Sequence, residues 1–378
     1  MQARGPDLYE DTRRLAAEVL APIAAKGRPG RVNRPLVQAL AKHGLLARLF
    51  PEVSATDLCI IREALATACT EAETAFALQG LGAYPILQAG SPELRDRWIP
   101  SVAEGTAIAA FALTEPEAGS DVSAMALRAT ADRDGYRLTG EKLWISNAPE
   151  ADVYTVFART SEGRRGLTAF AVDGDSQGLS GEHKAMVAPH AIGSLRFEDV
   201  YVPRECVLGE PGGGFGVAMR TLDLFRPSVG AFAIGMARQA LELAADWALE
   251  RHTFGKPLKD HQAVAHRIAD LTARVEAARL LVRAAAAAHD ENRPDPALAA
   301  MAKLLATETA QEAVDAAVQF HGARALEHGH PLEHLYREVR APRIYEGASE
   351  IQREIIARAV FREAEGRRTA GGGEAAGV

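Results

Sequence analysis

Residues 319–358 read QFHGARALEHGHPLEHLYREVRAPRIYEGASEIQREIIAR, two helix-like patterns separated by the short break RIYEGA. Ser349 followed by Gln352 has the spacing of a capping box, which predicts a new helix from Ser349. Gly347 lets the backbone bend just before it. Glu346 is therefore expected on a turn at the start of a helix, where a fixed and partly desolvated carboxylate can act as a general base. The helix macrodipole alone also favours an acid at this place.

The composition is that of an ordinary globular protein. The chain has 378 residues, of which 47% are apolar and 25% charged, and a net charge of −7. This length favours two or three domains, and the negative charge argues against nucleic-acid binding. The first residues show no signal peptide and no apolar run is long enough for a membrane span. The three cysteines have no metal-binding spacing, so we expect a reducing, cytoplasmic location and no membrane association.

The spacing of apolar residues changes twice along the chain. Residues 7–105 follow helical spacing, whereas residues 108–202 contain runs of strand length with a hairpin signal at Asp134-Gly135. From residue 216 the spacing is helical again. We predict an α+β fold, mostly α, with an N-terminal helical domain, a middle antiparallel β-barrel or sandwich, and a C-terminal four-helix bundle. The expected boundaries are 1–106, 107–210 and 211–365, followed by a disordered tail at 366–378.

Two predicted strand ends carry side chains that suit a cofactor. After one strand, Thr114 and Ser120 offer hydroxyls, and Gly119 permits close approach of a ligand to the backbone. Trp144 and Ser146 end another strand, where a flat ring beside a hydroxyl can flank a planar cofactor. The first segment also fits a simple polar turn, and a tryptophan at a strand end also fits a core position.

A third polar segment, RHTFG at 251–255, lies between two predicted helices, with Gln262 beyond it. An arginine at a helix end beside a threonine and a glycine suits a phosphate or adenine contact, although a solvated helix end explains the same residues. GGGFG at 212–216 does not satisfy the dinucleotide-binding motif and opens a helical region. The histidines at 321–334 lack zinc spacing, so no metal site is expected.

Together these segments resemble the acyl-CoA dehydrogenases, and the resemblance covers nearly the whole chain. ALTEPEAGSD at 112–121 resembles the first family signature, and KLWISNA at 142–148 the flavin-facing strand end. RHTFGKPLKDHQ and QFHGARAL resemble the segments that contact the dinucleotide half of FAD. IYEGASEIQREIIAR at 344–358 resembles the segment with the catalytic base, and LDLFRP at 222–227 the substrate-gripping helix.

The resemblance implies an FAD-dependent dehydrogenase of fatty-acid β-oxidation that converts an acyl-CoA to the trans-2-enoyl-CoA and passes electrons to an electron-transfer flavoprotein. Glu346 would abstract the α-proton and flavin N5 would accept the β-hydrogen as a hydride. The backbone N–H of Glu346 and a ribityl hydroxyl would hold the thioester carbonyl. Thr114 and Ser146 would hydrogen-bond around the isoalloxazine, and Trp144 would pack against it.

The other implied contacts belong to the cofactor, the substrate and a neighbouring subunit of a homotetramer. Further cofactor contacts are expected at Phe111, Leu113, Gly119, Ser120, Thr253, Ser349 and Glu350. The adenine-diphosphate half, largely that of the neighbouring subunit, would be met by Arg251, Phe254, Gln262, Gln319 and Gly322. Substrate contacts are expected at Ser120, Asp223, Arg226, Tyr345 and Gly347, with the acyl pocket lined by Leu78, Leu81 and Tyr84.

The same fold leaves alternatives open. The substrate of such an enzyme can instead be bound to a carrier protein, or the reduced flavin can react with oxygen directly. A non-catalytic flavoprotein or DNA-associated relative is a further reading, against which Glu346 and the negative charge argue. Where some branches of the family place the base, this chain has Phe225, which cannot serve. Ala348 and Ala323 replace residues that the family commonly uses near the cofactor, so they bear on FAD affinity.

Overall fold

The computed structural model describes residues 6–163 and 166–371 and contains two compact units, Met1–Phe225 and Arg226–Val378. The division falls inside one long helix, α7 (Gly214–Glu250). The N-terminal helices and the strands share the first unit.

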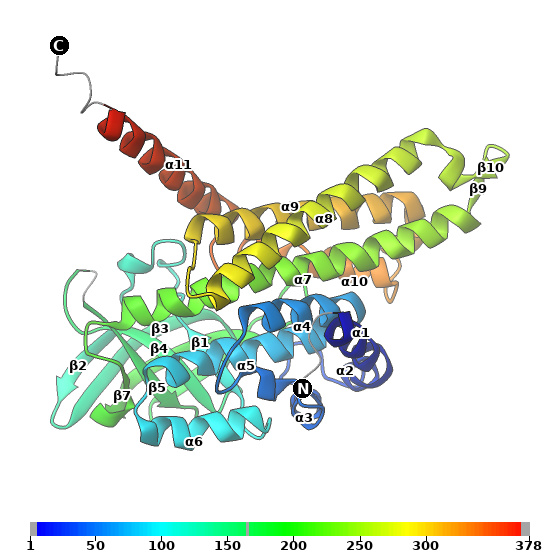
Figure 1. Cartoon of the computed structure of the whole chain (residues 1–378). Helices are drawn as coiled ribbons and strands as arrows, with labels where there is room; N and C mark the ends of the chain where they lie inside the picture. Colours follow the sequence, from blue (N-terminus) through cyan, green and yellow to red (C-terminus); the bar gives the residue numbers. More distant parts are fainter. Residues whose placement is uncertain (1–5, 164–165, 372–378) are drawn as a thin grey trace, which may run out of the picture. The chain divides into compact units, whose positions relative to one another are not determined.

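The first unit begins with helices that cover a sheet (Figure 1). Its helical segments are α1 (Pro6–Leu15), η1 (Ala16–Leu20), α2 (Ala21–Ala24), α3 (Arg34–Lys42), η2 (Leu46–Leu49), α4 (Ala55–Ala68), α5 (Thr70–Ala89) and α6 (Pro92–Ala103). The side chains of Asn33, Ser54 and Ser91 cap α3, α4 and α6. Helix α5 packs against α4 and the first strand, so it is mostly buried.

The strands of the first unit form one eight-stranded sheet. They are β1 (Ala109–Ala112), β2 (Arg128–Asp132), β3 (Gly135–Ser146), β4 (Val153–Arg159), β5 (Leu167–Asp173), β6 (Leu179–His183), β7 (Ile192–Pro203) and β8 (Val207–Leu208). The pairing order is β6-β7-β3-β2-β4-β5-β8, with β1 parallel to β4. Among the described strands, the two edge strands β6 and β8 do not pair with each other, so the sheet is open. The predicted closed barrel is therefore wrong. Closure requires a consistent tilt and stagger of every strand, and the end strand β8 has only two residues.

The strand-rich middle region is otherwise confirmed, although β6 and β8 were not predicted and β1 pairs with β4 in parallel rather than in the expected antiparallel direction. Strands β2 and β3 form the predicted antiparallel hairpin, with Asp132 opposite Gly135 and Arg133 in the left-handed region at φ +48°. Strands β4 and β5 are buried at every residue except the last. Burial on both faces explains why their sequences are continuous apolar runs.

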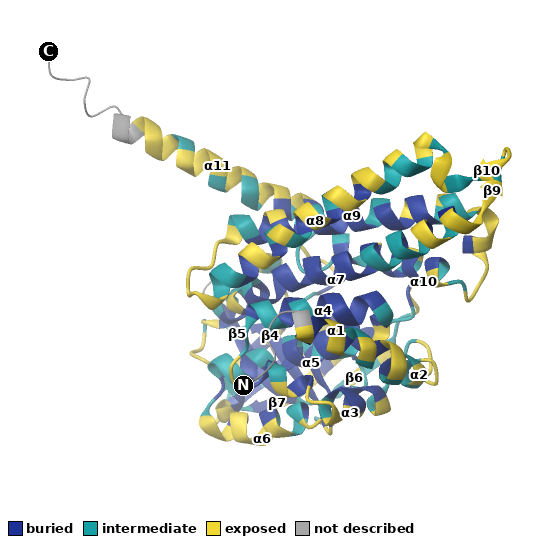
Figure 2. Ribbon diagram, turned by 45° about the vertical axis from the view of Figure 1, so that its right-hand side comes forward, coloured by how far each residue is buried: buried dark blue, intermediate teal, exposed yellow. Residues whose placement is uncertain are grey.

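The second unit is helical. It contains most of α7, the short strands β9 (His252–Thr253) and β10 (Lys256–Pro257), and then α8 (Gln262–Asp290), α9 (Pro296–His321), η7 (Gly322–Leu326), α10 (Pro331–Glu338), η8 (Ala341–Arg343) and α11 (Ser349–Gly371). Helix α9 packs against α8, α10 and α11 and is the central helix of the unit. Figure 2 shows α11 extending away from α8 and α9, largely exposed. It continues into the segment expected to be a tail, of which residues 372–378 lie outside the described residues.

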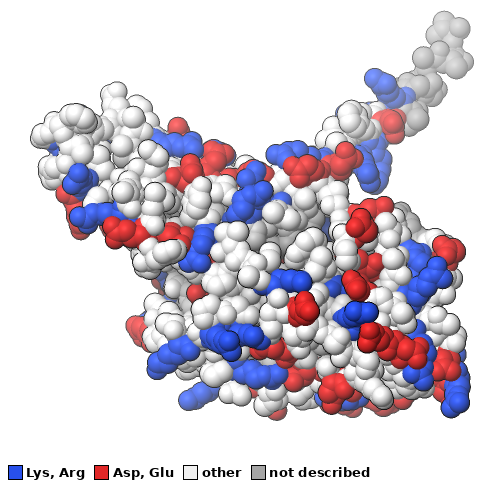
Figure 3. Space-filling model, turned by 180° about the vertical axis from the view of Figure 1, so that it is seen from behind, with Lys and Arg blue, Asp and Glu red and all other residues white. Residues whose placement is uncertain are grey.

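Charges of both signs are interspersed over the face shown in Figure 3. Within the described ranges, no helix is both long and apolar enough to cross a membrane. All three cysteines are free thiols and are buried.

Candidate active site

Glu346 lies on the turn between η8 and α11, as the sequence predicted. Its φ is +52° and that of Gly347 is +95°, so two successive residues occupy the left-handed region. For a glutamate this conformation costs about 1–2 kcal/mol. The surrounding residues must therefore hold the turn in place.

A lysine of α9 holds the backbone on both sides of Glu346. The ammonium Nζ of Lys303 donates to the carbonyl oxygens of Tyr345 at 3.0 Å and Gly347 at 2.6 Å. Gln352 Nε2 donates to the Gly347 carbonyl as well, at 2.8 Å. Lys303 was not predicted, because nothing near residue 303 in the sequence indicates a partner in the turn.

A glutamate of the same helix joins the two ends of the turn. Glu308 accepts a hydrogen bond from Ser349 Oγ at 2.6 Å and forms an ion pair with Arg343 at 2.8 Å. The predicted helix start at Ser349 is confirmed, but the expected capping box is wrong. The Ser349 hydroxyl donates to Glu308 instead of accepting from the backbone of its own helix, and the Gln352 side chain donates to the Gly347 carbonyl.

Burial and nearby charges shift the pKa values of Lys303 and Glu308, which both contact the turn. Burial lowers the pKa of the Lys303 ammonium to about 8, opposed mainly by the attraction of Glu346 and reinforced by the nearby Arg226. Burial by itself raises the pKa of Glu308, but hydrogen bonds from Ser349 and Arg343 outweigh it and leave the pKa below its ordinary value. Helix α9 thus places a buried cation beside the candidate base.

In the first unit, a buried ion pair braces the loop after β1. Lys142 on β3 is 0% exposed, and its Nζ donates to the Leu113 carbonyl at 2.9 Å and to Glu115 Oε1 at 2.8 Å. Glu115 also accepts from the backbone N–H groups of Ala126 at 2.5 Å and Leu127 at 3.0 Å. Burial lowers the pKa of Lys142 to about 8, although Glu115 opposes the shift. This pair ties the end of β3 to the loop that carries Thr114.

The strand ends of the first unit fit a planar, hydrogen-bonding cofactor. Trp144 is 50% exposed and adopts φ +54°, which is unusual for so large a side chain in a strand. Among the described residues, the hydroxyls of Thr114, Ser120 and Ser146 have no hydrogen-bond partner. A Cβ added at Gly119 would meet no atom within 4 Å. The exposed indole, open hydroxyls and clear approach to the backbone are the features that an isoalloxazine ring requires.

The other cofactor candidates of this unit, Phe111 and Leu113, are both half-buried. Phe111 packs on Phe157 with ring centroids 5.0 Å apart. Phe111 therefore supports the loop from within the unit.

The predicted adenine-binding residues of the second unit lie at its surface. Phe254 is 97% exposed at φ +50°, in the β9–β10 hairpin beside the exposed Arg251. Thr253 lies 3.3 Å from His261 Nε2. Gln262 opens α8, and Gln319 and Gly322 lie at the exposed end of α9.

The predicted substrate residues are spread over α5, α7 and the turn. Tyr84 packs edge-on against Phe225 with centroids 6.1 Å apart, while Leu81 is half-buried on the same helix. On α7, Asp223 is half-buried and Arg226 is only 7% exposed. Tyr345 and Glu350 flank the turn, the first half-buried and the second exposed.

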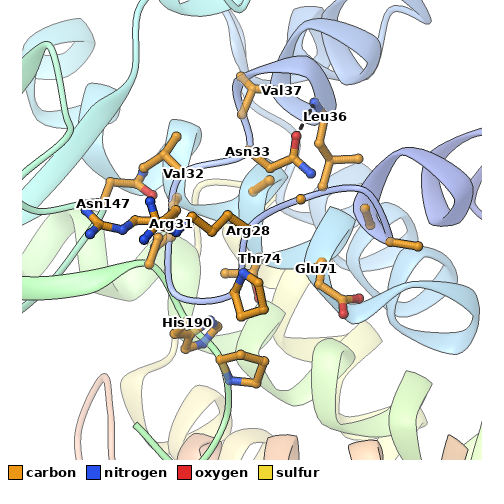
Figure 4. Close-up of a pocket in the computed structure, with 18 residues that line it drawn as sticks. Arg28, Arg31, Val32, Asn33, Leu36, Val37, Glu71, Thr74, Asn147 and His190 are labelled. Atoms are coloured by element: carbon orange, nitrogen blue, oxygen red, sulfur yellow. Dashed lines mark hydrogen bonds between the residues drawn. The ribbon is translucent and has the colours of Figure 1, made fainter. Parts of the chain in front are cut away.

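Leu78 lines a pocket of about 280 Å³ in the first unit. Thr74 and Glu71 of α5 share the wall with Arg28 and His190 (Figure 4). This combination of residues was not predicted, because the wall of the pocket comes from segments far apart in the chain. Burial lowers the pKa of His190. Polar side chains and apolar ones such as Leu36 and Val37 share this wall about equally.

No group of three or more His, Cys, Asp or Glu side chains within residues 6–163 and 166–371 has metal-binding geometry. His321 instead stacks on Trp247 with ring centroids 5.1 Å apart, and burial lowers its pKa.

Family models match most of the chain. The matches are acyl-CoA dehydrogenase, N-terminal domain, at residues 6–106; the middle domain at residues 110–200; and the C-terminal domain at residues 212–361.

Individual proteins are similar over nearly the full length. Cyclohexane-1-carbonyl-CoA dehydrogenase of Geobacter metallireducens is 37% identical over 369 residues, which are 94% of this chain and 97% of that protein. The FAD complex of PigA is 28% identical, with a TM-score of 0.88 over 96% of this chain and 99% of its own. A chain from the study of the electron transferring flavoprotein of Acidaminococcus fermentans is 33% identical, with a TM-score of 0.89 over 96% of this chain and 100% of its own.

Proposed function

Because the chain belongs to the acyl-CoA dehydrogenase family, an FAD-dependent family of oxidoreductases, we propose that it oxidises the Cα–Cβ bond of an acyl-CoA to the trans-2-enoyl-CoA with Glu346 as the base. The observation that carries this proposal is the strained turn at φ +52°, which α9 holds in place around the Glu346 carboxylate. FAD supplies the acceptor for the β-hydrogen, which leaves as a hydride.

The proposed task of Glu346 is to take the α-hydrogen as a proton. This hydrogen is only weakly acidic, so the reaction needs a positioned base together with a polarised carbonyl. We assign the carbonyl contact to the backbone N–H of Glu346. The nearby Lys303 ammonium favours the ionised carboxylate, the form in which a base must start.

For the cofactor we propose that Thr114 and Ser146 bond to the isoalloxazine and that Trp144 packs against it. Their support is the exposed indole and the open hydroxyls at these strand ends. Ser120 and Gly119 are assigned to the pyrophosphate or pantetheine, since both are exposed on the same loop.

We propose an electron-transfer flavoprotein as the electron acceptor, and the likeness to a chain from a study of such a flavoprotein supports this assignment. Under air, the reduced enzyme should then consume oxygen slowly without the acceptor protein. Rapid oxygen uptake with acyl-CoA alone would contradict this part of the proposal.

We further propose a homotetramer in the cytoplasm. The exposed Phe254 at 97% and Phe361 at 65% are large apolar surfaces that association would cover. Free buried thiols agree with a reducing compartment. Sedimentation of the holoenzyme tests the assembly, and a monomer at micromolar concentration would overturn it.

The base assignment is tested with Glu346→Gln, which keeps the size of the side chain and removes its basicity. The purified variant should retain FAD, and its flavin should stay oxidised when mixed anaerobically with acyl-CoAs that bleach the parent enzyme. A rate of bleaching at least 100-fold lower is expected, since a positioned base contributes about 10²- to 10⁴-fold.

Glu354→Gln is the matched control, because Glu354 is an exposed glutamate on α11 that pairs only with Arg358 among the described residues. It should bleach at the parental rate. Parental bleaching by Glu346→Gln would show that another group takes the proton.

A further inference from the structure

Lys303 is a buried charge on an otherwise apolar part of α9. It is 0% exposed, and Ala300, Ala302 and Ala306 around it are buried as well. Burying an ammonium is costly unless it is paired and hydrogen-bonded. A methionine or leucine would fill the same space without that cost, so the stability of the helix alone does not explain a lysine here.

The hydrogen bonds of Lys303 converge on one backbone segment. Both acceptors are carbonyl oxygens, one immediately before Glu346 and one immediately after it. Because one ammonium bridges both carbonyls, the backbone of Glu346 cannot rotate without stretching at least one of these bonds. That backbone is the one whose φ lies in the unfavourable left-handed region.

Charges from every surrounding element act on this ammonium. Glu346 of the turn, Glu308 of α9 and Glu350 of α11 stabilise its charged form, whereas Arg226 of α7 disfavours it. The cluster places a cation that can lose its proton near neutral pH next to the proposed base.

We propose that Lys303 is a positioning residue for the dehydrogenation, which holds the backbone of Glu346 in its left-handed conformation and so aims the carboxylate at the α-carbon. This role rests on the proposed function, since it requires Glu346 to be the base. Lys303 touches neither substrate nor cofactor in this role. Deprotonation of the ammonium weakens its bonds to the two carbonyls and removes the positive charge beside Glu346.

The test compares the parent with Lys303→Met and Lys303→Arg as FAD-loaded enzymes. Each is mixed anaerobically with increasing acyl-CoA between pH 6.5 and 10, and the limiting rate of flavin bleaching and the acyl-CoA dissociation constant are obtained separately. Lys303→Met should lower the limiting rate about 100-fold, the effect of a misplacement near 1 Å. Its dissociation constant should change less than threefold.

The pH profile separates positioning from a purely structural role. In the parent, the limiting rate should fall above about pH 8, where Lys303 loses its proton. Lys303→Arg stays charged throughout this range, so its limiting rate should show no such fall. Thr307→Val is the matched control, because within the described part of the chain this buried hydroxyl bonds only to backbone carbonyls of α9. It should keep the parental rate and profile.

The outcomes distinguish this inference from the base assignment. If Glu346→Gln abolishes bleaching but Lys303→Met bleaches at the parental rate, the base stands and the positioning role is wrong. If Glu346→Gln bleaches normally, the base assignment itself fails. If Lys303→Met does not retain FAD, the test uses the parent and Lys303→Arg alone. Identical pH profiles of the limiting rate in these two proteins would overturn the proposal.

Discussion

At the scale of single residues, the strained pair Glu346 and Gly347 is the most informative feature of the chain. The sequence revealed the glycine and the helix start after it, and from these the turn was predicted. Lys303, which holds the turn, was invisible because its partners are more than forty residues away in the chain and are backbone atoms. Every residue has a backbone carbonyl, so a side chain that bonds to such carbonyls requires no particular residue type as its partner.

Gly347→Ala tests the strain at this scale. At φ +95° a side chain is disfavoured, and the added Cβ would lie 2.5 Å from Gln352 Nε2. We expect a loss of about 1–3 kcal/mol in the free energy of unfolding and slower flavin bleaching, because the turn must shift. Urea denaturation and anaerobic mixing measure the two effects. Parental stability and rate together would show that the turn is not strained.

Among the secondary-structure elements, α9 and β3 each contain a buried lysine that hydrogen-bonds to a loop with candidate site residues. Lys303 of α9 bonds to the turn around Glu346, and Lys142 of β3 bonds to the Leu113 carbonyl beside Thr114. The motif ALTEPEAGSD indicated the loop but not the ion pair between Glu115 and Lys142, since Glu115 looks like an ordinary polar turn residue in the sequence. The structure shows Glu115 to be 4% exposed.

Lys142→Met should be strongly destabilising, because it leaves the Glu115 carboxylate buried without its cation. The expected loss is about 3 kcal/mol in the free energy of unfolding, with easier release of FAD. The double variant Glu115→Gln, Lys142→Met should recover part of this loss. Urea denaturation of all forms, with FAD fluorescence to follow release, provides the measurement. A loss below about 0.5 kcal/mol for the single variant would contradict the brace.

The contact between α8 and α9 should depend on pH through Glu312. Hydrogen bonds from Arg274 and Arg267 lower the pKa of Glu312 to about 2, despite an opposing effect of burial. The ionised carboxylate therefore contributes stability above the unfolded pKa of about 4.3, and this contribution is lost as the pH falls through about 2.

Glu312→Gln should accordingly lower the free energy of unfolding by about 1 kcal/mol at pH 7, a modest value because the side chain is 41% exposed. The difference from the parent should vanish between about pH 4.5 and 2. Denaturant titrations at several pH values measure it, with Glu276→Gln on the exposed face of α8 as a control. A difference that persists unchanged at pH 2 would contradict the assignment.

At the scale of the whole molecule, the order of helical, strand-rich and helical regions was readable from the sequence. Apolar spacing and the Asp134-Gly135 hairpin are local signals, and they predicted the long helices and most of the strands but not β6 and β8. The open sheet was not predicted, since closure depends on the pairing of β6 and β8, which are separated in sequence and gave no signal of their register. The pocket behind Leu78 was missed for the same reason, because its wall combines α5 with distant loops.

If the Glu346 carboxylate takes the α-proton, the hydrogen on the α-carbon of the acyl-CoA should exchange with solvent. The parent holoenzyme is incubated anaerobically in D₂O with acyl-CoA, and the recovered acyl-CoA is analysed by mass spectrometry. Because reversal of the reaction returns a solvent-derived deuteron from Glu346, the parent and Glu354→Gln should incorporate deuterium at the α-carbon. Glu346→Gln should incorporate no more than a sample without enzyme. Parental deuteration by Glu346→Gln would contradict the account.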